Sequence, residues 1–209
     1  MNHTSVFQNL QDSNELPREE LIAIFEETEA IQHGHFVLTS GRHSDTYVQC
    51  ARVMESPRLT VQLAAQALKK VPASVLESVD VVVSPAVGGI TFGFAVGYVL
   101  GKKFIFAERK DGAMQLRRSF QVAPGERVLI SEDVVTTGGS VKEVEDLVCA
   151  AGGEVVGVVS LIDRKTDKKF SAPYWGLLEF AAQSWDPVDC ELCATGSTPQ
   201  SLGSRNLSR

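Results

Sequence analysis

One segment of this 209-residue chain constrains its fold more than any other. Residues 128–130 form an apolar run, two adjacent acids follow at Glu132 and Asp133, and a Thr/Gly/Ser turn occupies 136–140. An apolar run that leads through such a turn into a helical pattern is typical of a strand–loop–helix unit. Glycines let the backbone approach a ligand, and the N-terminus of a helix favours an anion. The segment therefore predicts a phosphate site.

The acid pair predicts what lies beside the phosphate. Carboxylates at the end of a strand can accept hydrogen bonds from sugar hydroxyls or hold a divalent cation. A 5-phosphorylated ribose is the ligand that fits both halves of the segment. The spacing differs from that of a Walker A loop and of a GxGxxG fingerprint, so these two phosphate binders fit poorly. The alternative is an ordinary strand followed by a capped helix with no ligand site, and the acid pair argues against it.

Strand and helix patterns alternate along the rest of the chain. Helices are predicted at 59–70, 90–100 and 139–151, and strands at 79–84, 102–107, 127–131 and 155–162. This alternation implies βαβ units with right-handed crossovers. We therefore predict an α/β fold, a mainly parallel twisted sheet flanked by helices, with ligands at the carboxyl ends of the strands.

The N-terminal part is expected to form a small hood beside this sheet. A helix is predicted at 17–32, and two short strands at 35–39 and 46–50 flank a turn. No linker or internal repeat divides the chain. The expected organisation has three parts: a flexible or disordered extension at 1–16, one domain including the hood at 17–189, and a polar tail at 190–209.

Charge and hydropathy exclude several classes of partner. The net charge of −6 argues against nonspecific nucleic-acid binding. The longest apolar run, 90–100, is too short to span a bilayer, so no membrane partner is expected. Residues 1–14 are polar and lack the features of a secretory signal, which makes the cytoplasm the default location.

Four cysteines in a chain of this length do not make a disulfide framework. Cys190 and Cys193 form one CxxC pair near the C-terminus. A single pair could bind a metal only with two further ligands from elsewhere in the chain or from a second subunit.

The segment 128–140 resembles the phosphoribosyl pyrophosphate (PRPP) signature of the type I phosphoribosyltransferases. A second stretch, FVLTSGRHS at 36–44 followed by Tyr47, resembles the N-terminal signature of the orotate phosphoribosyltransferases. The resemblance covers nearly all of 19–187. It implies the type I phosphoribosyltransferase fold and transfer of the 5-phosphoribosyl group from PRPP to orotate, giving orotidine 5′-monophosphate and pyrophosphate in pyrimidine biosynthesis.

The resemblance also assigns roles to individual residues. Glu132 and Asp133 match the catalytic acid pair that faces the ribose, and Mg²⁺ is held mainly by PRPP with these two acids as further ligands. Orotate is expected to contact Thr136, Arg164, Ser40 and Tyr47, with Arg164 reading the carboxylate, for which a fork of N–H donors is well suited. PRPP is expected to contact Glu132, Asp133, Val134, Val135, Thr136, Thr137, Gly138, Gly139, Ser140, Arg109, Lys110 and Arg117.

A basic stretch, 109–118, matches the family's mobile loop. The resemblance implies that Arg109 and Lys110 act in catalysis and reach the neighbouring subunit's site, so that the enzyme is a homodimer with shared sites. Cations that arrive on loop closure would stabilise the departing pyrophosphate. The alternative for this stretch, which also carries Arg117 and Arg118, is a solvated basic hairpin.

The chain departs from the family at three sources of positive charge. Lysines of well-known members are replaced by Thr39 and Gly88, and a Lys/His pair is absent from 111–116. His35 and His43 are not assigned as acid–base groups, because displacement by an anionic pyrimidine needs no strong base. Two alternatives to the orotate enzyme stay open: a phosphoribosyltransferase for another base, and a noncatalytic regulator that senses PRPP.

Overall fold

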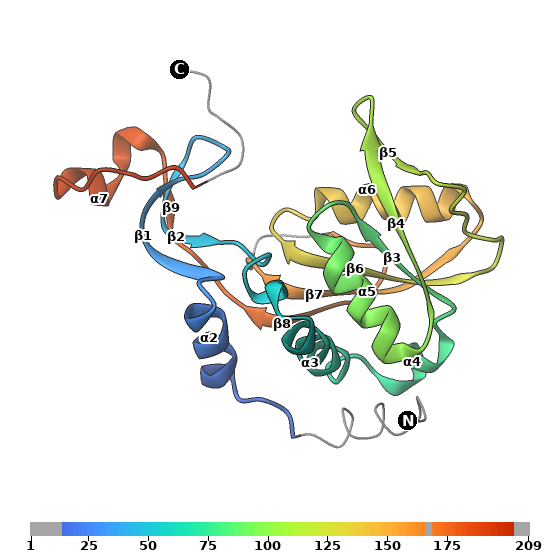
Figure 1. Cartoon of the computed structure of the whole chain (residues 1–209). Helices are drawn as coiled ribbons and strands as arrows, with labels where there is room; N and C mark the ends of the chain where they lie inside the picture. Colours follow the sequence, from blue (N-terminus) through green and yellow to red (C-terminus); the bar gives the residue numbers. More distant parts are fainter. Residues whose placement is uncertain (1–13, 166–168, 203–209) are drawn as a thin grey trace.

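A six-stranded sheet forms the centre of the computed structural model, which describes residues 14–165 and 169–202 (Figure 1). The strands lie in the order β5-β4-β3-β6-β7-β8, and every neighbouring pair is parallel except β4 with β5. Their bounds are β3 Val81–Pro85, β4 Lys103–Lys110, β5 Ala113–Leu116, β6 Arg127–Val135, β7 Glu154–Asp163 and β8 Tyr174–Glu179. The predicted α/β fold with a mainly parallel sheet is confirmed.

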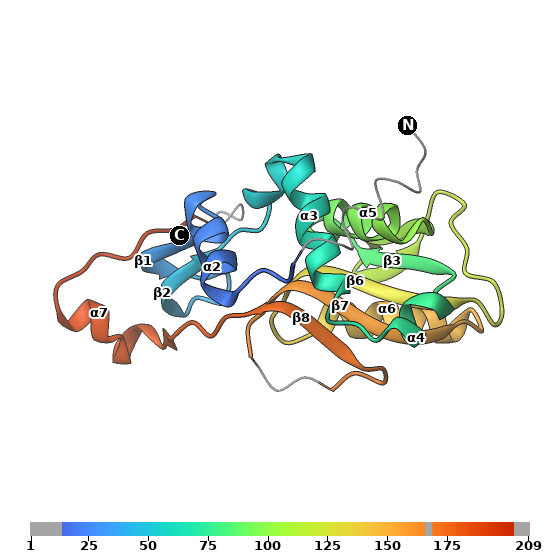
Figure 2. The same ribbon diagram turned by 90° about the horizontal axis from the view of Figure 1, so that it is seen from below.

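Helices cover both faces of this sheet (Figure 2). α3, Pro57–Leu68, and α5, Gly89–Leu100, pack on one face, and α6, Gly139–Ala150, packs on the other. The side chains of β6 alternate accordingly, because Leu129 joins the core beneath α3 and α5 whereas Val128 and Ile130 join the core beneath α6. Burial on both faces explains why the parallel strands read as continuous apolar runs. The short helix α4, Ala73–Ser78, precedes β3.

The hood consists of α2, Arg18–Glu27, and a three-stranded antiparallel sheet in the order β1-β2-β9. Its strands are β1 Ile31–Val37, β2 His43–Val48 and β9 Ser184–Trp185, and the short 3-10 helix η1, Val53–Glu55, leads from it into α3. The hood lies beside the main sheet (Figure 1). The helix predicted at 17–32 is longer than the observed α2. It ends at Glu27, Glu29 takes a positive φ of 55°, and Ile31 pairs with Val48.

The chain returns to the hood after β8. Past β9 come the 3-10 helix η2, Pro187–Asp189, and the short helix α7, Glu191–Ala194. The Gln200 N–H donates to the His35 carbonyl, and the Val37 N–H donates to the Gln200 carbonyl, each at 2.8 Å. Residues 190–200, expected to belong to a polar tail, thus extend along the hood. Most of the predicted N-terminal extension, and the end of that tail, lie outside the described residues.

Candidate functional site

A strand, a turn and a helix form the predicted phosphate loop. β6 ends at Val135, and α6 begins at Gly139. Gly138 has a φ of +80°, and a Cβ atom there would come within 2.6 Å of the Phe170 ring, so this position requires glycine. A cavity of about 230 Å³ opens at this turn. Its lining is Arg109, Glu132, Val134, Val135, Thr136, Thr137, Gly138, Gly139, Ser140, Val141 and Glu143.

The acid pair stands at the carboxyl end of β6, as the sequence predicts. Glu132 is only 8% exposed, and the Asp133 N–H donates to its Oε1 at 3.2 Å. Burial, and then the charge of Asp133, raise the pKa of Glu132 well above its ordinary value. A cation or a hydroxyl donor beside these carboxylates would reverse that effect, because it favours the ionised form. The pair is therefore suited to a polyhydroxylated or cation-bearing ligand.

The turn before α5 approaches the acids closely. A Cβ atom at Gly89 would lie 2.8 Å from Glu132 Oε1, and one at Gly88 would lie 2.6 Å from Asp133 Oδ2. Any larger residue at Gly88 must displace the Asp133 carboxylate as it stands. The glycine that replaces a family lysine here thus leaves room for the acid pair.

The basic stretch forms the hairpin of β4 and β5. Arg109 forms an ion pair with Glu143 of α6, in which Nη1 and Nη2 lie 2.9 and 3.0 Å from the two carboxylate oxygens. Arg109 also lines the cavity of its own chain. We expected Arg109 and Lys110 to serve a neighbouring subunit. In the structure Arg109 faces its own phosphate loop, and Lys110 is exposed near the hairpin turn. The sequence did not predict Glu143 as a site residue. Its role depends on contact with the hairpin, and no local pattern in the helix indicates that contact.

Arg117 and Arg118 lie outside the lining of this cavity. Both pair with Glu108 Oε1, at 3.5 and 3.2 Å, and the Arg118 guanidinium lies 5.5 Å from the centre of the Phe106 ring. The exposed positions of both arginines fit the alternative of a solvated basic hairpin.

Arg164 follows β7, next to the phosphate loop. Its N–H donates to the Val135 carbonyl at 3.0 Å, which continues the pairing of β7 with β6. Burial lowers the pKa of the guanidinium, and the negative charge of Asp45 in β2 opposes this shift. Asp45 was not predicted as a site residue, and its charge acts on Arg164 from the hood. A half-buried cation of this kind is suited to binding an anionic group.

The other two residues expected at orotate lie in the hood and do not line the cavity. Ser40 is exposed in the turn between β1 and β2, where its Oγ accepts from the Arg42 N–H at 3.4 Å. Tyr47 is half-buried, and its hydroxyl donates to the Leu202 carbonyl at 3.4 Å. Their role toward a ligand stays a prediction.

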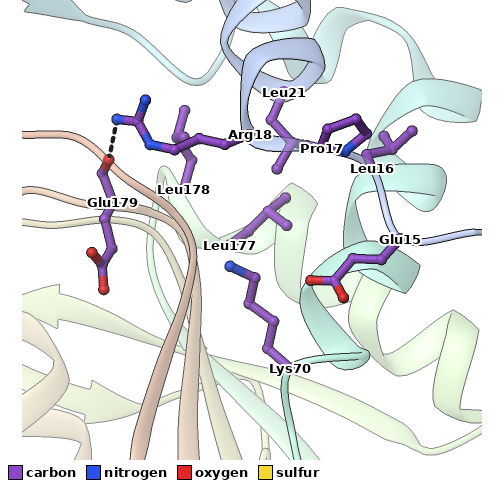
Figure 3. A pocket seen from close by; sticks show the side chains of 9 residues that line it. All are labelled: Glu15, Leu16, Pro17, Arg18, Leu21, Lys70, Leu177, Leu178 and Glu179. Atoms are coloured by element: carbon purple, nitrogen blue, oxygen red, sulfur yellow. Dashed lines mark hydrogen bonds between the residues drawn. The ribbon is translucent and has the colours of Figure 1, made fainter.

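A second cavity, of about 430 Å³, lies between α2 and the end of β8 (Figure 3). Arg18 spans it and donates to the Glu179 carbonyl at 3.2 Å. Its charged lining balances two acids, Glu15 and Glu179, against Arg18 and Lys70. None of the predicted site residues lines this cavity, so the chemistry is expected at the phosphate loop.

Comparison with known proteins agrees with this geometry. The model of the phosphoribosyl transferase domain family matches residues 56–189. The orotate phosphoribosyltransferase of Caldanaerobacter subterraneus subsp. tengcongensis is 42% identical over 193 residues, covering 92% of this chain and all of the relative. That of Thermotoga maritima is 46% identical over 188 residues, covering 88% of this chain and 97% of the relative. The chain belongs to the orotate phosphoribosyltransferase family.

Solved structures support the fold of this family member. Orotate phosphoribosyltransferase from Aeropyrum pernix superposes with a TM-score of 0.66 at 20% identity, over 77% of this chain and 93% of that one. Adenine phosphoribosyltransferase from Rhodothermus marinus gives 0.60 at 22% identity, over 76% and 99%. Because the same fold serves both of those enzymes, the fold alone does not choose the base.

Proposed function

We propose that this chain transfers the 5-phosphoribosyl group from PRPP to orotate, giving orotidine 5′-monophosphate and pyrophosphate in the synthesis of UMP. The observation that carries the proposal is the acid pair of buried Glu132 and partly buried Asp133 beside the glycine-bearing phosphate loop, in a chain 42–46% identical to orotate phosphoribosyltransferases. A phosphate cavity with carboxylates at its rim suits a 5-phosphorylated ribose.

Each group has a distinct task. The loop 136–140 binds and orients the 5-phosphate at the start of α6, and the acid pair holds the ribose. The bond from the anomeric carbon to pyrophosphate breaks, and the pyrimidine nitrogen bonds to that carbon. The negative charges of Glu132 and Asp133 favour the positive charge that develops on the ribose in between. The protein therefore contributes orientation and electrostatics rather than covalent chemistry.

The acid pair also fits a magnesium ion, because carboxylate oxygens are the protein ligands that Mg²⁺ prefers. Glu132 and Asp133 would hold it together with oxygens of PRPP. When bound, Mg²⁺ neutralises charge on the departing pyrophosphate. Burial raises the pKa of Glu132, and a cation bound beside it would favour the carboxylate again.

Orotate is favoured over other bases by Arg164, a half-buried arginine whose backbone pairs with Val135 just before the phosphate loop, and by the hood signature at 36–44. A base without a carboxylate would leave Arg164 with only the charge of Asp45 to offset its burial. A PRPP-sensing regulator has no comparable support from the described residues. The expected absence of nucleic-acid and membrane partners and the cytoplasmic location stay predictions, and no described helix is long and apolar enough to cross a bilayer.

A homodimer is supported by an apolar face on α5 and β4. Phe94 and Tyr98 of α5 are 62% and 37% exposed. Phe94 and Tyr98 border a shallow hollow of about 670 Å³ with Phe104 and Phe106. Contiguous exposed apolar surface of this kind marks an interaction site. The β4–β5 hairpin rises from the same region (Figure 1), so a second copy on this face would lie within reach of Lys110.

The proposal is tested by incubating the purified chain with orotate, PRPP and Mg²⁺ and quantifying orotidine 5′-monophosphate by mass spectrometry. Wild type should form the product, and Asp133→Asn should require more PRPP and more Mg²⁺. Asp146→Asn, an exposed acid on α6 paired with Lys142, is the matched control and should behave as wild type. A folded wild-type chain that forms no product would rule the proposal out.

A further inference from the structure

Four side chains that could hold a metal ion converge in the hood, and none of them lines the phosphate cavity. His35 comes from β1, His43 begins β2, Cys190 precedes α7 and Cys193 lies within it. One ligand atom from each residue lies within 4.8 Å of all the others. The CxxC pair thus finds its two further ligands within the same chain.

The separations match a tetrahedral ion. His35 Nε2 lies 3.0 Å from His43 Nδ1, and Cys193 Sγ lies 3.4 Å from His43 Nδ1. His35 Nε2 lies 3.4 Å from Cys190 Sγ and 3.8 Å from Cys193 Sγ. Tetrahedral zinc with bonds of about 2.0–2.1 Å to nitrogen and about 2.3 Å to sulfur sets N–N, N–S and S–S separations of about 3.3, 3.6 and 3.8 Å.

Hydrogen bonding among the four groups explains this arrangement less well. One ring nitrogen, His35 Nε2, meets three polar atoms within 3.8 Å, yet it carries either one proton or one lone pair. The cysteines are free thiols rather than a disulfide. The other ring nitrogen of His35, Nδ1, lies 3.2 Å from Ser197 Oγ, an outer contact that orients a ligating histidine. The inward nitrogens and sulfurs therefore point at one common centre.

The surrounding structure needs such a link. α7 buries none of its residues, and Val188 just before it is 90% exposed. His35, His43 and Cys190 are 6%, 8% and 3% exposed, so three of the four ligand side chains are buried in the hood. A small unit without an adequate apolar core commonly relies on a metal or a disulfide.

We propose that His35, His43, Cys190 and Cys193 bind one structural Zn²⁺ that fastens the C-terminal segment to the β1–β2 hairpin. Two thiolates and two imidazoles in tetrahedral array are a ligand set typical of zinc. All four positions belong to the protein, which leaves none open for a substrate and makes the site structural. The site does not depend on the proposed transferase reaction, because none of the four lines the phosphate cavity.

Metal content tests the proposal directly. The full chain, without a polyhistidine tag, is purified in buffer free of chelators and analysed by inductively coupled plasma mass spectrometry. Wild type should carry about one zinc per chain. Cys193→Ser and His43→Gln should lose it, whereas Cys149→Ser, which removes the exposed cysteine of α6, should keep it. Equal zinc in wild type and in both ligand variants would show that the metal sits elsewhere.

A spectroscopic measurement on the wild-type chain keeps the proposal testable even if the variants fold poorly. Wild type is stripped of metal with a chelator and titrated with Co²⁺. We expect saturation at one equivalent, with the absorption of tetrahedral thiolate-bound cobalt, and displacement by Zn²⁺. Hydrogen exchange should slow at 184–202 when Zn²⁺ is restored. A titration without thiolate bands and without change in exchange would overturn the inference.

Discussion

Replacement of Arg164 by alanine should damage the use of orotate far more than the use of PRPP. The backbone N–H of Arg164 pairs with the Val135 carbonyl just before the phosphate loop, and burial lowers the pKa of its guanidinium, so the side chain gains from an anionic partner. A charged hydrogen bond contributes about 1.5–3 kcal/mol, and a forked pair does not add fully. Because Arg164 is only half-buried, we take about 2–3 kcal/mol for the whole fork. At about 1.36 kcal/mol per factor of ten, kcat/KM for orotate should fall roughly 30- to 160-fold.

The assay is initial-rate kinetics with each substrate varied in turn. The KM for PRPP should stay within about twofold, since a residue that contacts one substrate loses binding for that substrate. Arg164→Lys keeps the charge and loses the fork, so an intermediate loss is expected. Arg127→Ala removes an exposed arginine at the opposite end of the sheet and serves as the control. Equal losses for orotate and PRPP would refute the assignment of Arg164 to the orotate carboxylate.

Three further results are expected. Gly138→Ala and Gly125→Ala both place alanine at a φ near +80°, which costs about 1–2 kcal/mol of stability, and Gly138→Ala also crowds the Phe170 ring. Only Gly138→Ala should raise the KM for PRPP, roughly tenfold, and equal KM values would remove the loop from the PRPP site. Burial raises the pKa of Tyr174 from 10.0 to about 12, so the free energy of unfolding of wild type should fall as pH rises through that interval. In denaturant titrations the fall should be roughly 1–2 kcal/mol larger for wild type than for Tyr174→Phe, and an equal fall in both proteins would contradict this. Mixed Lys110→Ala and Asp133→Asn subunits should recover about a quarter of wild-type activity if sites are shared, whereas confirmed subunit exchange without recovery would place Lys110 at its own chain's site.

The phosphate loop could be predicted because its parts are contiguous. The apolar run of β6, the acid pair and the turn follow one another, and local patterning decides each of them. The edge strands were harder. β8, with the sequence YWGLLE, carries a central glycine and becomes a strand through its pairing with β7. β5, with the sequence AMQL, lies within the basic stretch 109–118, where no strand pattern is present, and it forms through its pairing with the end of β4.

Contacts between segments that are distant in the chain could not be predicted from the sequence. His35 and His43 stand eight residues apart, and their neighbours in space, Cys190 and Cys193, lie roughly 150 residues further on. No periodicity connects such positions, so the sequence could supply only half of the ligand set. The ion pair of Arg109 with Glu143 follows the same rule, because its geometry depends on how the hairpin folds against α6.

The measurement that tests the central claim most directly is a competition among bases. Orotate, uracil, adenine and hypoxanthine are supplied together at equal concentration with limiting PRPP and Mg²⁺, and the nucleotides formed are separated and quantified. We expect orotidine 5′-monophosphate to account for nearly all product, because Arg164 binds a carboxylate that the other three bases lack. A chain that consumes PRPP to make chiefly another nucleotide, or that forms no nucleotide at all while folded, would contradict the account.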